Sequence, residues 1–169
     1  KYTSGALIVA KKRESASFYT QKFLSKQIKK TYLALTRGAP DIKTGVISFP
    51  LEKSNQKKML KNQSQFQDAA TQYEVIETTE DRISLIKLEP ITGRKHQIRK
   101  HLSMLKAPII GDTKYGNDDA LDRTDKRFYL HSYKIEFPRF SDGKNILIKA
   151  EIPQYFQEAI STLGIQINE

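Results

Sequence analysis

The chain has 169 residues and no cysteine, so it is long enough for one domain with a core and excludes disulfides, thiolate zinc sites and cysteine nucleophiles. Lys and Arg number 29 against 19 Asp and Glu, a formal net charge of +10, which favours a polyanionic partner, nucleic acid first. No apolar run approaches the roughly 20 residues of a membrane span, and no signal-peptide pattern follows the first residues, so we expect a cytoplasmic protein.

The first predicted element is the apolar run Ala-Leu-Ile-Val-Ala at residues 6–10, which has the composition of a buried strand. A helix with one apolar face is expected next, at about residues 14–27. A second strand is expected at residues 31–37, and the Gly-Ala-Pro that follows at residues 38–40 marks a turn. Residues 52–67 are polar and basic, which indicates a mobile loop or an exposed hairpin.

The second half of the chain adds more strands than helices. Strands are expected at residues 70–78, 82–89, 128–137 and 146–151. One helix is expected to open at Thr92-Gly93, and the last one to run from Pro153 to Gly164. Strands and helices do not alternate, so the predicted class is α+β, with a mainly antiparallel sheet flanked by helices and loops. No linker or repeat divides the sequence, which predicts one domain over residues 1–169.

Three segments carry a more specific signal than composition does. They are Thr-Ser-Gly at residues 3–5, Lys-Thr-Tyr-Leu-Ala-Leu at residues 30–35, and Pro-Ile-Thr-Gly-Arg-Lys-His-Gln-Ile-Arg at residues 90–99. Pro-Ile-Ile-Gly-Asp at residues 108–112, then Tyr-Gly and Leu-His, follow further on, and we interpret Gly111-Asp112 as part of an architectural turn. Each motif alone is weak. In this order and at this spacing, over nearly the whole chain, the sequence resembles the RluA family of pseudouridine synthases.

The resemblance implies an activity, a fold and a partner. Enzymes of this family break the N-glycosidic bond of a chosen uridine in RNA, turn the base and rejoin it through carbon 5, without a metal or an organic cofactor. The implied fold is the pseudouridine-synthase catalytic domain. The implied partner is RNA, with large-subunit (23S) ribosomal RNA as the first choice and transfer RNA as the second. We further expect a monomer.

The same resemblance locates the family's catalytic aspartate. The family signature reads His-Arg-Leu-Asp, two variable residues, then Thr-Ser-Gly, and Lys1 and Tyr2 fill the variable places. The aspartate would therefore directly precede Lys1. We expect the chain as given to be a catalytic domain that lacks its N-terminal part, binding RNA without isomerising it.

Two further catalytic residues follow from the resemblance. Tyr32 matches a tyrosine that lies against the uracil, where a phenol can act as the base for the carbon 5 proton or stack on the ring. Arg99 matches an arginine that pairs with the catalytic aspartate. In a chain without that aspartate, we expect Arg99 to have lost its partner. Ile98 either packs against the uracil or belongs to the core.

Several basic residues are candidates for binding the RNA backbone. Arg94 and Lys95 lie at the start of a predicted helix, where backbone amides favour phosphate; equally, they could be ordinary surface charge. The basic segment contributes four lysines expected to bind phosphates, Lys53, Lys57, Lys58 and Lys61. The histidines have no metal-binding spacing, and we expect no metal site.

Two other functional classes compete with an RNA isomerase. One is a basic α+β module that binds RNA and does no chemistry. The other is a hydrolase acting on RNA or a nucleotide, which has weaker support because the sequence offers neither a cysteine nor a metal cluster. Aromatic stacking signatures typical of common RNA-binding modules are absent from the sequence.

Overall fold

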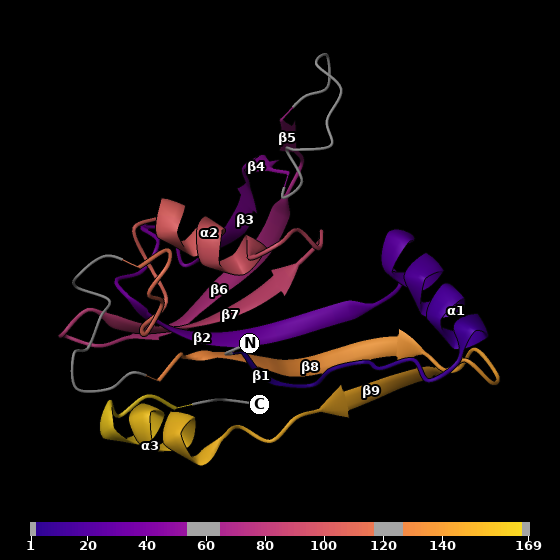
Figure 1. Ribbon diagram of the computed structural model, residues 1–169. Helices are drawn as coiled ribbons and strands as arrows, with labels where there is room; N and C mark the ends of the chain where they lie inside the picture. Colours follow the sequence, from indigo (N-terminus) through magenta and orange to yellow (C-terminus); the bar gives the residue numbers. More distant parts are fainter. Residues whose placement is uncertain (1–2, 54–64, 117–126, 167–169) are drawn as a thin grey trace.

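The computed structural model describes residues 3–53, 65–116 and 127–166. Its elements in chain order are β1 (Ser4–Gly5), α1 (Arg13–Leu24), β2 (Lys29–Arg37), β3 (Thr44–Ser48), β4 (Leu51–Glu52), β5 (Phe66–Gln67), β6 (Ala70–Thr78), β7 (Ile83–Pro90), α2 (Gln97–Met104), β8 (Leu130–Pro138), β9 (Asn145–Lys149) and α3 (Gln154–Thr162). Seven strands form one sheet in the order β1-β8-β2-β7-β6-β3, with β9 also paired to β8 (Figure 1). The described strand pairs are antiparallel except β1 with β8, which confirms the predicted α+β class.

The two faces of the sheet carry separate hydrophobic clusters, because successive side chains of a strand point to opposite faces. On β2, Ala34 belongs to the cluster that α2 covers with Ile98 and Leu102. Its neighbour Leu33 belongs to the opposite cluster, which α3 covers with Phe156, a side chain with no exposed surface. Figure 1 shows α2 and α3 on the two sides of the sheet. The sheet is therefore a shared wall between two cores.

The predicted strand at residues 6–10 is not a strand, and it is not buried. Only Ser4–Gly5 pairs with β8, and Leu7 and Val9 are 82% and 72% exposed. The reason is competition for one edge. From Lys134 onward β9 pairs with β8, so the chain after Gly5 finds no strand edge to join.

Other boundaries differ from expectation for local reasons. The helix expected from Thr92 begins only at Gln97, because His96 has a left-handed backbone (φ 56°) and residues 92–96 form a loop. The basic segment is a hairpin at its ends, where β4 pairs with β5, and residues 54–64 lie outside the described part. Strand β3 was not predicted. No described helix is both long and apolar enough to cross a membrane.

Candidate active-site cleft

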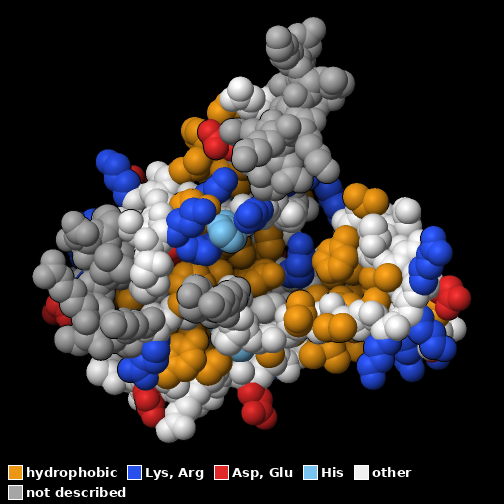
Figure 2. Space-filling model, in the orientation of Figure 1, with side chains coloured by type: hydrophobic (Ala, Val, Ile, Leu, Met, Phe, Trp, Pro, Cys, Tyr) orange, Lys and Arg blue, Asp and Glu red, His pale blue; other side chains and the backbone are white. Residues whose placement is uncertain are grey.

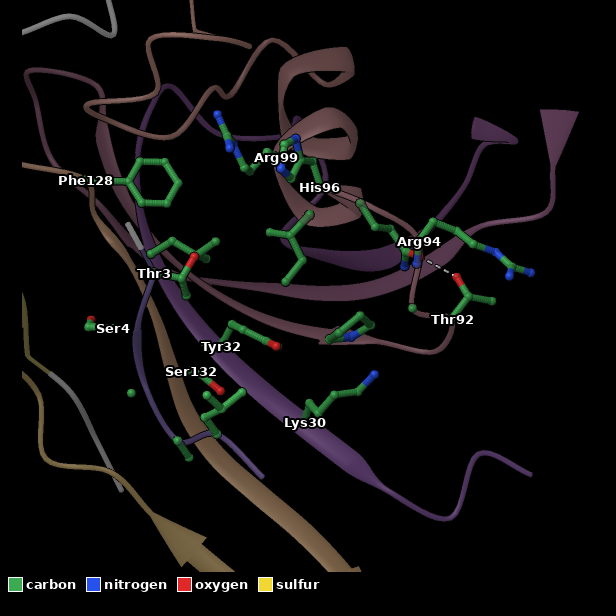
Figure 3. Close-up of a pocket in the computed structure, with 18 of the residues that line it drawn as sticks. Thr3, Ser4, Lys30, Tyr32, Thr92, Arg94, His96, Arg99, Phe128 and Ser132 are labelled. Carbon is green, nitrogen blue, oxygen red and sulfur yellow. Dashed lines mark hydrogen bonds between the residues drawn. The ribbon is translucent and has the colours of Figure 1, made fainter. Parts of the chain in front are cut away.

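One cleft of about 890 Å³ opens where β1, β2 and β8 meet the loop before α2 (Figure 3). Four of the residues predicted from the sequence line it together: Tyr32, Arg94, Ile98 and Arg99. They come from one strand, one loop and one helix, so the fold collects residues that are far apart in the sequence. Ile98 is 7% exposed and belongs to the core cluster under α2 while it also lines the cleft; its contact with the uracil stays a prediction.

The predicted phosphate-binding lysines are not part of this lining. Lys95 is exposed on the loop beside the cleft, and Lys53 lies next to the β4–β5 hairpin. Lys57, Lys58 and Lys61 lie outside the described residues. Their proposed contact with RNA therefore stays a prediction.

The Thr-Ser-Gly motif forms one wall of the cleft. Ser4 Oγ lies 2.9 Å from Nδ1 of His131, which is fully buried, and both residues belong to paired strands. Gly5 has a φ of +105°, and a Cβ there would lie 2.2 Å from the backbone oxygen of Ser132. Only glycine allows this approach. The motif thus fixes the chain against β8 and places Thr3 in the cleft wall.

Tyr32 lies half-buried on the cleft floor. Burial raises the pKa of its phenol, and a hydrogen bond with the Ser132 side chain partly offsets that rise. The hydroxyl is therefore protonated at neutral pH in the free protein. A ring in this position can stack on a base, while service as a proton acceptor requires prior loss of its own proton.

Arg99 is not left without a partner, which corrects the expectation from the sequence. Its Nε and Nη2 atoms donate to the two carboxylate oxygens of Asp112 at 2.8 and 2.6 Å. The Asp112 side chain is 1% exposed and also accepts from the backbone N–H groups of Lys114 and Tyr115 at 3.0 Å each. The turn that was interpreted as architectural therefore supplies the arginine's counter-ion. Neither of these bonds uses Arg99 Nη1.

The two members of this pair shift each other's pKa. Burial alone would raise the pKa of Asp112, but the Arg99 guanidinium and the two backbone N–H groups outweigh it, so the pKa is lowered. The Asp112 carboxylate in turn raises the pKa of Arg99. Arg99 is also held flat, with its Cζ 4.9 Å from the ring centre of Tyr115 and 5.2 Å from that of Phe128. The guanidinium is thus fixed in the cleft before any ligand arrives.

Gln97 is a positioning residue that the sequence analysis did not identify. Its Oε1 accepts from the Thr92 hydroxyl at 2.6 Å and from the Arg94 backbone N–H at 3.0 Å. Its Nε2 donates to the backbone oxygen of Ala70 and to the Thr71 hydroxyl, both at 2.9 Å. Two of these bonds reach the loop before α2 and two reach β6, so the buried amide links the loop to that strand. Gln97 belongs to the motif at residues 90–99, but its spacing there does not indicate these bonds.

The Gln97 network continues to His101, which has no exposed surface. His101 Nε2 lies 3.2 Å from the Phe49 backbone oxygen, which can only accept, so this nitrogen carries the proton. Nδ1 then accepts from the Thr71 hydroxyl at 2.9 Å. Burial lowers the pKa of His101, in keeping with a neutral ring. Gln97, Thr71 and His101 therefore form one chain of donors and acceptors beneath the cleft.

The mouth of the cleft is positively charged. His96 lines it with Nδ1 3.0 Å from the Tyr115 hydroxyl, and its pKa is lowered by burial and by Arg99, Lys114 and Lys95. Figure 2 shows Lys and Arg side chains around a hollow with a hydrophobic floor, beside a histidine. Within the described residues, no three His, Cys, Asp or Glu side chains are placed to hold a metal ion. Cations over an apolar floor suit a nucleotide, with its phosphate outside and its base inside.

Comparison with known proteins identifies the family. A family model described as RNA pseudouridylate synthase matches residues 1–104, more than half of the chain. The chain belongs to the RNA pseudouridylate synthase family. The RluA-type resemblance seen in the sequence motifs is thereby confirmed.

Relatives and solved structures agree with this assignment. The chain is 36% identical over 159 residues to ribosomal large subunit pseudouridine synthase C of Rickettsia bellii, which covers 92% of this chain and 52% of the relative. It is 32% identical to tRNA pseudouridine synthase C of Salmonella typhimurium, over 96% of this chain and 69% of the relative. The structure of human RNA pseudouridylate synthase domain containing 4 superposes with a TM-score of 0.76 at 26% identity, over 94% of this chain and 70% of that one. The chain spans about half the length of the Rickettsia relatives it matches.

Proposed function

We propose that the protein to which this chain belongs converts uridine to pseudouridine in RNA, and that residues 1–169 are part of its catalytic domain. The observation that carries the proposal is the cleft, which unites Tyr32, Ile98 and Arg99 with the Thr-Ser-Gly wall. Large-subunit ribosomal RNA is the proposed substrate and transfer RNA the second choice. The names of the relatives from Rickettsia and Salmonella support these two, in that order of similarity.

The proposed chemistry assigns each cleft residue a task. The bond from the ribose to N1 breaks, the uracil turns, a bond to carbon 5 forms, carbon 5 loses its proton and N1 gains one. Tyr32 stacks on the uracil, loses its phenol proton to solvent with the Ser132 hydrogen bond easing that loss, and as the phenolate accepts the carbon 5 proton, while N1 takes its proton from solvent. Ile98 packs against the base. Arg94 and Lys95, on the loop before α2, bind the RNA backbone, as do Lys53, Lys57, Lys58 and Lys61 of the basic segment.

Arg99 is proposed to orient the catalytic aspartate through Nη1. Asp112 occupies Nε and Nη2, so a second carboxylate can reach the guanidinium only at the remaining edge. The family signature places that aspartate directly before Lys1, and Thr3 already lies in the cleft wall. Among the described residues no Asp or Glu lines the cleft, which supports the alternative that residues 1–169 alone bind RNA without reacting.

The test uses RNA tritiated at uridine carbon 5, from which isomerisation releases tritium to water. We expect no sustained release with the chain of 169 residues, and release with a version that carries His-Arg-Leu-Asp ahead of Lys1. The matched control replaces the aspartate of that extension with asparagine, which keeps the shape and removes the charge. Equal release by the control and the extended chain would refute the proposed role of the aspartate. No release from any ribosomal or transfer RNA would refute the function.

The same assay separates the two roles of Tyr32. Tyr32→Phe in the extended chain keeps the stacking ring and removes the hydroxyl. We expect RNA affinity within a few-fold of the unchanged protein and turnover lower by about 100-fold or more, the usual size of a proton-transfer contribution. Near-normal turnover would limit Tyr32 to stacking, which its raised pKa in the free protein also favours.

A further inference from the structure

Lys30 is a charged residue at the cleft for which the proposed chemistry has no task. It lies two residues before Tyr32 on β2, lines the same cleft and is half-buried, and Figure 3 shows both side chains extending into the open space. Its ammonium lies 5.7 Å from the ring centre of Phe23. Among the residues that the structure describes, no carboxylate forms an ion pair with it. Burial lowers its pKa, as desolvation does for a cation without a counter-charge.

A second hollow of about 400 Å³ begins at the same residue. Lys30 and Pro90 line both the cleft and this groove, and they lie at the end of the sheet where β2 begins and β7 ends. The other sheet residues of the groove, such as Thr31 and Lys134, project from the face of the sheet opposite to Tyr32, so a polynucleotide strand can pass from the cleft to the groove only around this end of the sheet. The further lysines of the groove are Lys26, Lys29 and Lys134.

The charge and the surface of the groove fit a polynucleotide strand better than a small anion. Two glutamates also line it. Glu136 pairs with Lys29 at 3.5 Å, and Glu89 accepts from the Thr31 hydroxyl at 3.4 Å and keeps its charge, so Lys26, Lys30 and Lys134 supply the excess of positive charge. Ile91 and Leu147 line it as well and are 42% and 63% exposed, which offers apolar surface to a base. Lysines beside exposed apolar side chains are what a single strand needs, since it presents phosphates and unstacked bases together.

We propose that Lys30 binds a phosphate next to the target uridine, and that the RNA strand leaves the cleft over Lys30 and passes around the end of the sheet into the groove, beside Lys26 and Lys134. This rests on the proposed function, because it takes the occupant of the cleft to be a uridine in RNA. The phosphate of the RNA then pairs with the Lys30 ammonium, with which no described carboxylate pairs. The groove then holds the flanking nucleotide and extends recognition beyond the reacting base.

The test measures binding by the chain of 169 residues, because the claim concerns binding alone. The probe is a fluorescent nine-nucleotide RNA with a single central uridine, titrated at several salt concentrations. Lys30→Gln is expected to weaken binding by about 5- to 10-fold and to make the log–log salt slope shallower by about 0.7, the value for one phosphate of a single strand. Lys30→Arg should restore the slope. Lys134→Gln should make the slope shallower by a similar amount. Lys43 is exposed and lies outside both hollows, so Lys43→Gln should leave the slope unchanged.

A phosphate scan identifies the contact. Each phosphate on either side of the uridine is replaced in turn by an uncharged methylphosphonate. In the unchanged protein one replacement beside the uridine should weaken binding, and in Lys30→Gln that same replacement should cost nothing further. Equal costs in both proteins at every position, or an unchanged salt slope in Lys30→Gln, would overturn the proposal alone. Failure of the unchanged chain to bind any RNA would also overturn the proposal, whereas the proposed function is decided separately by tritium release from the extended version.

Discussion

The two walls of the cleft treat their cations in opposite ways. On the α2 wall, Arg99 is paired through two nitrogens to a buried carboxylate that two backbone N–H groups also hold. On the β2 wall, Lys30 is half-buried and no described carboxylate pairs with it. In the first arrangement, the carboxylate of Asp112 fixes the position of the Arg99 guanidinium. In the second, the ammonium of Lys30 can still pair with the negative charge of a ligand. Both cations line the same cleft, so the difference in role that we infer comes from their partners and not from their positions.

Breaking the Arg99–Asp112 pair should produce the largest effect. Arg99→Ala leaves Asp112 charged, buried and without its main partner, so the free energy of unfolding should fall by roughly 3–5 kcal/mol at neutral pH. Removing both side chains should cost less than the sum of the two single changes. Denaturant unfolding of the three variants and the unchanged chain gives the coupling. Additive costs would mean that the pair contributes no coupling energy.

The same pair predicts a pH dependence. The pKa of Asp112 is lowered in the folded protein, so its stabilising contribution is complete above the pKa of the unfolded carboxyl, about 4, and is lost as the pH falls through the folded value. In Arg99→Ala, acid neutralises the orphaned carboxyl. The stability difference between Arg99→Ala and the unchanged chain should therefore shrink from pH 7 to pH 3, and a constant difference would contradict this account.

A smaller loss should follow from cutting the hydrogen-bond network beneath the α2 wall. Gln97→Leu keeps the volume and leaves the polar groups of Thr92, Thr71 and Arg94 without their partner, at a cost of roughly 1–3 kcal/mol. The matched control is Gln154→Leu on the exposed face of α3, expected within about 0.5 kcal/mol of the unchanged chain. If both variants melted alike, the loop before α2 would have to be held by other contacts.

The smallest effect should have the opposite sign, on the β2 wall. Lys30→Met removes a desolvated charge, so the free energy of unfolding should rise, by less than roughly 1 kcal/mol because water still screens the half-buried ammonium. The pKa of Lys30 is lowered by folding, so the penalty is complete below the folded pKa and vanishes above the unfolded value near 10.4. The gain should accordingly be larger at pH 7 than at pH 10.5. A loss of stability would show that Lys30 has a structural partner.

The fold class could be predicted from local patterns, and four residues that line the cleft could be predicted from the family resemblance and the basic motif. Strand alternation gave the bounds of β6 as observed, helix end signals gave α3 within two residues, and the motifs gave Tyr32, Ile98 and Arg99. The apolar run at residues 6–10 misled because composition does not show that β9 already occupies the edge of β8. Asp112 was seen in its motif but not as the partner of Arg99. That contact joins a helix to a turn, and spacing along one element cannot reveal it.

Gln97 and Lys30 were missed for different reasons. Gln97 acts through four hydrogen bonds to groups on a loop and another strand, and no periodicity encodes such a set. Lys30 is the first residue of the motif at residues 30–35. It lies two residues before Tyr32, so strand alternation already puts both side chains on the same face of the strand. The sequence shows neither the partial burial of this lysine nor that no described carboxylate pairs with it, and these two properties distinguish it from an ordinary surface lysine.

The short β1–β8 pairing has a practical consequence for handling the protein. Because Thr3 lines the cleft and Gly5 admits no side chain against Ser132, the chain is fixed at the cleft wall from its third residue. A purification tag or a fluorescent dye attached ahead of this point would start at the cleft. Under the proposed function, binding constants obtained with such an attachment would include competition between the label and RNA. Labels belong instead on exposed positions of the opposite side, such as Glu158 of α3.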